Sequence, residues 1–114
     1  MPASDEQKRA QIFRQHTQTM KKHHGLSFDI HTKQIKENIK IFKQQLKQAC
    51  DSHNTLMIES YRDKLFHSLA EQHILTIKKV GETYSTIPPY MYNNMLKTYI
   101  RQCMLVDTYI TSRQ

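Results

Sequence analysis

The chain has 114 residues, a formal net charge of +7, 38% hydrophobic residues and no tryptophan. That length suits one domain with a modest core. No apolar run approaches the roughly 20 residues of a membrane span, and none resembles the core of a signal peptide. The composition therefore argues against a membrane-spanning protein, and we expect an intracellular, cytoplasmic one.

The positive charge is concentrated in the first half of the chain. Residues 1–50 hold ten Lys or Arg against four Asp or Glu, whereas residues 51–114 hold seven against six. Such asymmetry indicates a basic docking face more than general solubilisation. The two cysteines, Cys50 and Cys103, lie far apart on expected apolar helix faces. We expect reduced, buried thiols, because disulfide scaffolds and metal sites show denser cysteine patterns.

Helices account for the whole pattern. Only two glycines and three prolines interrupt the chain, and no segment shows the alternation of a strand. The sequence predicts an all-α fold, an antiparallel bundle of three to four helices, as a single helical domain over residues 1–114. The expected parts are a weakly packed N-terminal helix within 1–24, a basic amphipathic helix over 29–50, a helix over 54–80 and an apolar helix over 88–111.

The first of these segments carries few apolar residues, namely Ala10, Ile12, Phe13 and Met20. Most helix stability in proteins comes from packing an apolar face. With so few apolar side chains, this helix is expected to pack weakly or to become ordered only when a partner binds. Ser4 and Gln7 fit a capping box at its start, and Gly25 fits a C-cap at its end.

The second segment pairs an apolar seam with a stripe of lysines. The seam consists of Ile35, Ile39, Phe42, Leu46 and Ala49. The basic stripe, as it is called below, consists of Lys33, Lys36, Lys40, Lys43 and Lys47. Both series recur about every 3.5 residues, which predicts one helix with a buried face and a positive flank. This flank is the best functional lead, and its candidate partners are an acidic protein, a nucleic acid or an anionic membrane surface. The alternative is a solvated face paired with carboxylates of the next helix.

A break in hydrophobic phase separates the second and third segments. The seam fails beyond Cys50, and a new stripe begins with Ile58, Tyr61, Leu65 and Leu69, so a turn is expected at residues 51–54. His73 falls within the new stripe, where a lone histidine is most often a hydrogen-bonded core residue.

Two groups of side chains raise the question of a metal. Carboxylate and imidazole groups recur every four residues on the third segment, at Glu59, Asp63, His67 and Glu71. This column lies opposite the apolar stripe and should face water, whereas metal sites in helical bundles project inward. His23, His24 and His31 cluster around Gly25 but match no zinc spacing. We expect no metal and no cofactor.

The fourth segment is the most apolar. Tyr92, Leu96, Tyr99, Cys103, Val106 and Ile110 repeat every three or four residues, and further methionines and leucines widen the apolar surface. A helix of this kind is normally central in its bundle or buried in a subunit interface. Tyrosine and methionine are enriched at interfaces, so a second contact region for a partner, or for a further copy of the chain, is expected at Tyr90, Met91, Tyr92, Met95, Leu96 and Tyr99.

Catalytic signatures are missing from the sequence. It has no glycine-rich phosphate loop, no nucleophile beside a base on a turn, and no pair of inward carboxylates. We therefore expect a non-enzymatic, protein-binding helical module: an adaptor, an assembly subunit or a chaperone-like factor. The first alternative is a nucleic-acid-binding helical protein that contacts phosphates through the basic stripe, and the second is a metal-binding bundle.

Overall fold

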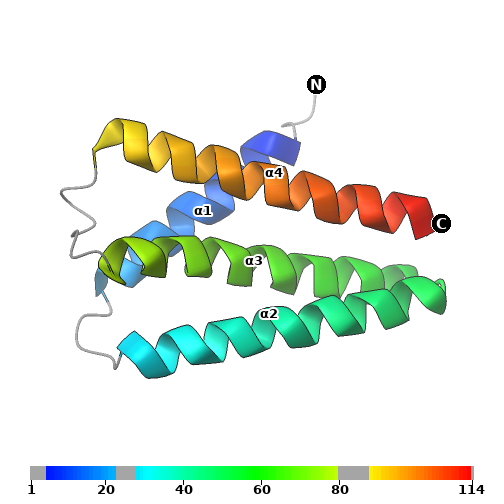
Figure 1. The fold of residues 1–114 in the computed structure, drawn as a ribbon. Coiled ribbons are helices and arrows are strands. Elements are labelled where there is room, and N and C mark those ends of the chain that lie inside the picture. The colour runs from blue at the N-terminus through cyan, green and yellow to red at the C-terminus, as the bar shows by residue number, and fades with distance from the viewer. Residues whose placement is uncertain (1–4, 23–27, 80–87, 114) are drawn as a thin grey trace.

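The computed structural model describes residues 5–22, 28–79 and 88–113. These residues form α1 (Asp5–Lys22), α2 (Phe28–Asp51), α3 (Thr55–Lys79) and α4 (Pro89–Arg113). Neighbouring helices α2, α3 and α4 run antiparallel in one layer, and α1 crosses α3 and α4 obliquely (Figure 1). The predicted all-α antiparallel bundle is confirmed. Gly25 and the loop of residues 82–87 lie outside the described residues.

The turn between α2 and α3 is built by His53 and Asn54. His53 has a φ of 53°, in the left-handed region, and its N–H donates to the Cys50 carbonyl at 3.1 Å. The Asn54 N–H donates to the Ala49 carbonyl at 3.1 Å, and these two bonds form a Schellman cap on α2. Asn54 Oδ1 then accepts a 3.2 Å bond from the Met57 N–H, which caps α3. One residue thus ends one helix and starts the next, at the predicted position.

The central helix is α3, which contacts each of the other three. It contributes the largest share of the described buried core: Ile58, Leu65, Phe66, Leu69, Ala70, Ile74 and Leu75. The sequence predicted that α4, the most apolar helix, would lie at the centre of the bundle or in a subunit interface. Both α3 and α4 contact all three other helices, but the central position belongs to α3, which lies between α2 and α4 in the layer and carries apolar side chains around its circumference (Figure 1).

The helix α1 is held more firmly than its sequence suggests. The side chain of Phe13 is fully buried among aromatic rings, with the Tyr92 ring centroid at 5.4 Å and the Tyr99 centroid at 5.5 Å. Arg9 forms an ion pair with Asp107 of α4. The described part of α1 contacts α3 and α4 but does not approach α2. Its few apolar residues therefore suffice for docking, because the largest of them enters the core.

Candidate functional site

An apolar hollow on the described surface lies between α2, α3 and α4, and is called the α2–α4 groove below. Its volume is about 420 Å³, and its lining residues are Lys43, Leu46, Lys47, Leu65, Leu69, Gln102, Leu105, Val106 and Tyr109. Ligand pockets in proteins commonly have volumes of about 300–1,000 Å³. The groove is therefore large enough for one or two side chains of a partner.

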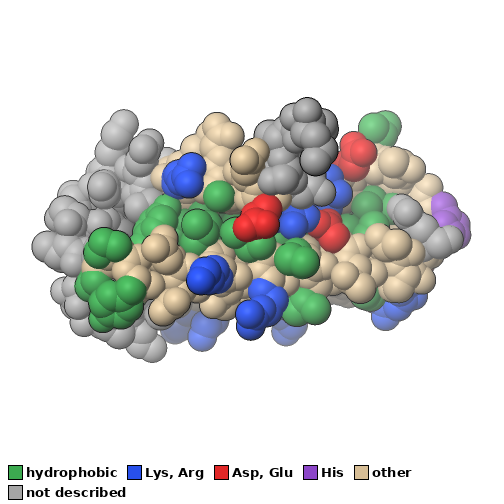
Figure 2. All heavy atoms as spheres, turned by 90° about the horizontal axis from the view of Figure 1, so that it is seen from above, with side chains coloured by type: hydrophobic (Ala, Val, Ile, Leu, Met, Phe, Trp, Pro, Cys, Tyr) green, Lys and Arg blue, Asp and Glu red, His purple; other side chains and the backbone are tan. Residues whose placement is uncertain are grey.

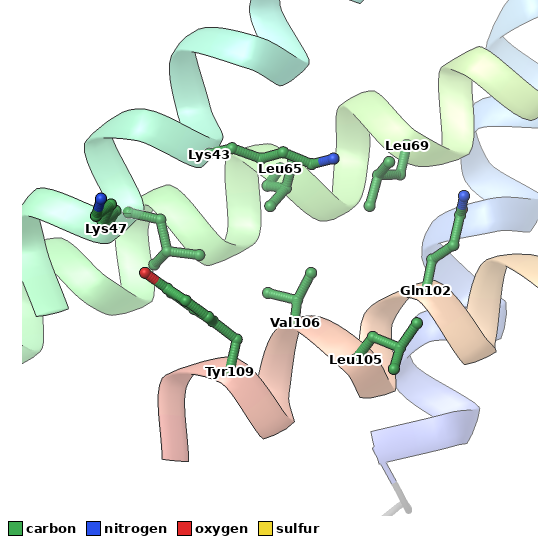
Figure 3. Close-up of a pocket in the computed structure, with 9 residues that line it drawn as sticks. Lys43, Lys47, Leu65, Leu69, Gln102, Leu105, Val106 and Tyr109 are labelled. Carbon is green, nitrogen blue, oxygen red and sulfur yellow. The ribbon is translucent and has the colours of Figure 1, made fainter. Parts of the chain in front are cut away.

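The groove has an apolar floor and two different rims (Figure 3). Leu65 and Leu69 of α3 form the floor, and Val106 of α4 points into the hollow. Lys43 and Lys47 stand on the α2 rim, one helical turn apart. On the α4 rim, the ring of Tyr109 lies across the groove with its hydroxyl toward α2 (Figure 3). None of the described residues that line the groove is acidic.

An ion pair joins α2 and α4 where the two helices end. The Arg113 guanidinium of α4 lies 3.0 Å from the Asp51 carboxylate of α2, where both helices end. From this end the ribbons of α2 and α4 diverge toward the opposite end of the layer (Figure 1).

All five lysines of the basic stripe are exposed on α2. Two of them, Lys43 and Lys47, also line the groove, whereas the other three do not. Within the described part of the chain, none of the five ammonium groups lies within 4.0 Å of a carboxylate. The alternative of a face paired with carboxylates of α3 therefore finds no support among these residues.

The residues predicted as a contact region on α4 do not share one surface. Tyr90 is 66% exposed, and Tyr99 is fully buried in the core. The other four, Met91, Tyr92, Met95 and Leu96, are partly buried. Tyr99 cannot contact a partner of the folded chain, since α1 and α3 cover it, so its assignment to an interface is wrong. The sequence missed this because the helical repeat marks an apolar face without saying which neighbour covers it.

A different part of α4 presents the exposed apolar surface. Met104 and Leu105 are 56% and 65% exposed. Figure 2 views the molecule from the α4 side, and hydrophobic side chains lie there between basic and acidic ones. Both residues fall outside the helical repeat that contains Cys103 and Val106. Their position off the buried face of α4 was the feature of the sequence that could have predicted their exposure. Leu105 also lines the groove, so this surface and the groove are continuous.

The histidine predicted in the core makes the expected kind of contact. Nε2 of His73 lies 2.7 Å from Oε1 of Gln102 in a part-buried hydrogen bond between α3 and α4. The nitrogen is the donor, since an amide oxygen only accepts. The ring of His73 also lies 6.4 Å from that of Tyr99, edge to face. The predicted hydrogen bond of His73 is confirmed, and the residue is half-buried beside the core.

The titratable column on α3 is less uniform than expected. Glu59 and Asp63 are exposed, as predicted, and the His67 ring lies 4.0 Å from the Asp63 carboxylate. Glu71 instead turns toward α2, where its carboxylate lies 3.8 Å from His31. Burial raises the pKa of Glu71, against the opposing attraction of His31 and His67. The placement of Glu71 on a water-facing column is therefore wrong, because α2 packs over the end of that column.

Groups that could ligate a metal or attack a substrate are few in this region. Among the described residues, no three His, Cys, Asp or Glu side chains gather in a way that could hold a metal ion. His23 and His24 lie outside the described residues. Cys50 and Cys103 are free and buried, as predicted. Burial raises the pKa of Cys103 to about 11 and also raises the pKa of Tyr99 beside it. Both groups stay protonated near neutral pH.

Comparison with protein families, curated proteins and solved structures finds no match to this chain. No helix within the described ranges is both long and apolar enough to cross a membrane.

Proposed function

We propose that this chain is a non-enzymatic protein-binding module that docks an acidic partner against α2 and the neighbouring surface of α4. The basic stripe carries the proposal. Its five lysines are exposed on one helix, where Glu37 is the interleaved carboxylate, and among the described residues no carboxylate lies within 4.0 Å of their ammonium groups. Five like charges on one face repel one another, and a partner that brings negative charge relieves the repulsion.

Apolar surface beside the stripe favours a protein over a simple anion. Interfaces combine an apolar centre with a polar rim. Met104 and Leu105 are exposed on α4, and Leu105 reaches the same groove as Lys43 and Lys47. A protein partner covers both the charge and the apolar side chains, which is the chemistry of an adaptor, an assembly subunit or a chaperone-like factor.

The test is capture of binding partners from an extract of the source cells by the immobilised full-length chain. The variant Lys36→Glu/Lys40→Glu reverses two charges of the basic stripe. The matched control Lys8→Glu/Lys64→Glu reverses two exposed lysines on α1 and α3. We expect the first pair to abolish capture of a specific protein and the control pair to retain it. Equal capture by both variants would remove the stripe from the proposal.

Nucleic acid is the second candidate, and the extended geometry of the stripe favours it. The five lysines follow α2 over several turns, which allows successive contacts with a phosphate backbone. Size exclusion with light scattering and absorbance at 260 and 280 nm separates the candidates. Bound nucleic acid raises the 260/280 ratio at low salt and is released at high salt, whereas a protein module elutes clean. The same experiment reports self-association through Met104 and Leu105.

A further inference from the structure

We propose that the α2–α4 groove binds one acidic amphipathic helix of the partner protein. This inference rests on the proposed function and specifies the chemistry of the docked element. The helix lies along the groove, with apolar side chains against the α4 rim and carboxylates against the α2 rim.

The apolar side of the groove sets the first requirement. Leu65 and Leu69 on the floor are already almost fully buried, at 1% and 5% exposure, so a ligand gains little by covering them. The exposed apolar surface is on the α4 rim, where Leu105 is 65% exposed beside Val106 and Tyr109. An occupant must therefore cover the α4 rim and still reach the α2 rim. An α-helix, with a diameter of about 10–12 Å including side chains, can place an apolar face on one rim and a charged flank toward the other.

The charged side sets the second requirement. Lys43 and Lys47 are four residues apart on α2, which places them roughly 6 Å apart along its axis. Two carboxylates at positions i and i+4 of a second helix have the same spacing, so a helix aligned with α2 pairs with both lysines. Among the described lining residues no carboxylate opposes it, and Asp51 at the end of α2 is paired with Arg113.

The chain already holds one of its own helices in a similar way. On α1, one aromatic side chain, Phe13, enters the core, and one charged side chain, Arg9, pairs with Asp107. An aromatic anchor and an ion pair thus contribute to the docking of α1 on α3 and α4, together with the smaller apolar side chains of Ala10 and Ile12. The groove offers the complementary arrangement for an external helix, with apolar side chains on α4 and ammonium groups on α2.

The experiment uses the full-length chain and a designed peptide as the probe. The peptide is an 18-residue helix with leucines on one face and glutamates at i and i+4 on the flank. A second peptide replaces each glutamate with lysine, and a third scrambles the first. Fluorescence anisotropy gives the dissociation constants, and leucine and valine methyl NMR locates the bound peptide. We expect the acidic peptide to bind at least about tenfold more tightly than the other two, and to shift the Leu65, Leu105 and Val106 signals.

Matched charge reversals on the stripe test the site. Lys43→Glu/Lys47→Glu removes the groove pair, and Lys33→Glu/Lys36→Glu removes two lysines of the same stripe that do not line the groove. We expect the first pair to raise the dissociation constant of the acidic peptide by about tenfold or more, and the second pair to raise it by about threefold or less. Leu105→Ser is expected to weaken the peptide without changing the salt dependence of its binding, because it removes only apolar contact.

Three results overturn the inference. The first is equal binding of the acidic and scrambled peptides. The second is an equal loss in the two lysine pairs, which indicates a polyanion spread along the whole stripe. The third result has two parts. Single-stranded DNA displaces the peptide, and the same DNA binds the Lys33→Glu/Lys36→Glu variant as weakly as the Lys43→Glu/Lys47→Glu variant. If the Lys36→Glu/Lys40→Glu variant still loses a cellular protein partner while the peptide result fails, the proposed function stands and only the groove inference falls.

Discussion

Arg9 and Asp107 form an ion pair between α1 and α4, although they lie near opposite ends of the sequence. Arg62 of α3 approaches the same carboxylate at 3.7 Å. The Arg9 guanidinium also lies 5.5 Å from the centroid of the Phe66 ring. The Arg9 side chain is only 10% exposed, so water screens its attraction to Asp107 weakly. One carboxylate therefore links three helices.

Removal of that carboxylate charge should loosen the whole bundle. We expect Asp107→Asn to lower the free energy of unfolding by about 1–3 kcal/mol, because it leaves Arg9 desolvated without its counter-charge. Urea denaturation measures the change. Asp63→Asn is the control, since Asp63 is exposed and its nearest ionic neighbour is His67 at 4.0 Å. That control should shift stability by less than about 0.5 kcal/mol, and similar shifts in the two variants would contradict the role of Asp107.

Phe13 should dominate the docking of α1. Its side chain is fully buried, and truncation of a buried phenylalanine typically costs about 3–5 kcal/mol. We expect Phe13→Ala to lower stability by about 3 kcal/mol and to increase amide exchange in α1 more than in α2, which α1 does not contact. Hydrogen exchange with mass spectrometry reads out both helices. Leu56→Ala, at a 78% exposed position, is the control and should leave exchange in α1 unchanged.

The raised pKa of Glu71 gives the chain a pH-dependent term in stability. A carboxyl whose pKa is higher in the folded chain than in the unfolded one binds its proton more tightly when folded. The stabilisation that this bound proton gives the folded chain is complete below the unfolded pKa of about 4.3, and it is lost as the pH rises through the folded pKa. Glu71→Gln removes this loss. We therefore expect the stability of the variant relative to wild type to increase between about pH 4 and pH 7.

Urea midpoints at a series of pH values measure that difference. Glu59→Gln, which changes an exposed carboxyl on the same helix, is the control, and its difference from wild type should change less with pH than that of Glu71→Gln. A stability difference for Glu71→Gln that decreases as the pH rises would have the wrong sign for a buried carboxyl. It would indicate instead that the attraction of His31 outweighs the burial.

The thiols should be inert in the folded chain. With the pKa of Cys103 at about 11, only about one thiol in a thousand is ionised at pH 8. In the unfolded chain, with an ordinary pKa of about 8.5, roughly a quarter are ionised. We expect a disulfide reagent to modify Cys103 at least about 100-fold more slowly in buffer than in urea. Cys50→Ser isolates the Cys103 signal, and fast modification in buffer would show that the α3–α4 contact opens readily.

Local pattern was sufficient for the elements and for several of their residues. The seam of α2, the turn around His53 and Asn54, the buried cysteines and the bonded His73 all follow from the spacing of apolar and polar side chains. The sequence places these residues on an apolar helix face or in a single turn, because side chains three or four positions apart share a face. The partner that His73 binds, Gln102, comes from another helix and was not predicted.

Only the tertiary structure decided which faces meet. It placed α3 at the centre, buried Tyr99, turned Glu71 toward α2, and left Leu105 exposed beside Lys43. Each of these outcomes depends on residues from different helices, such as Arg9 and Asp107, that no local repeat relates. A helical repeat specifies an apolar face, and the packing of the other helices determines whether a core, a groove or solvent lies against it.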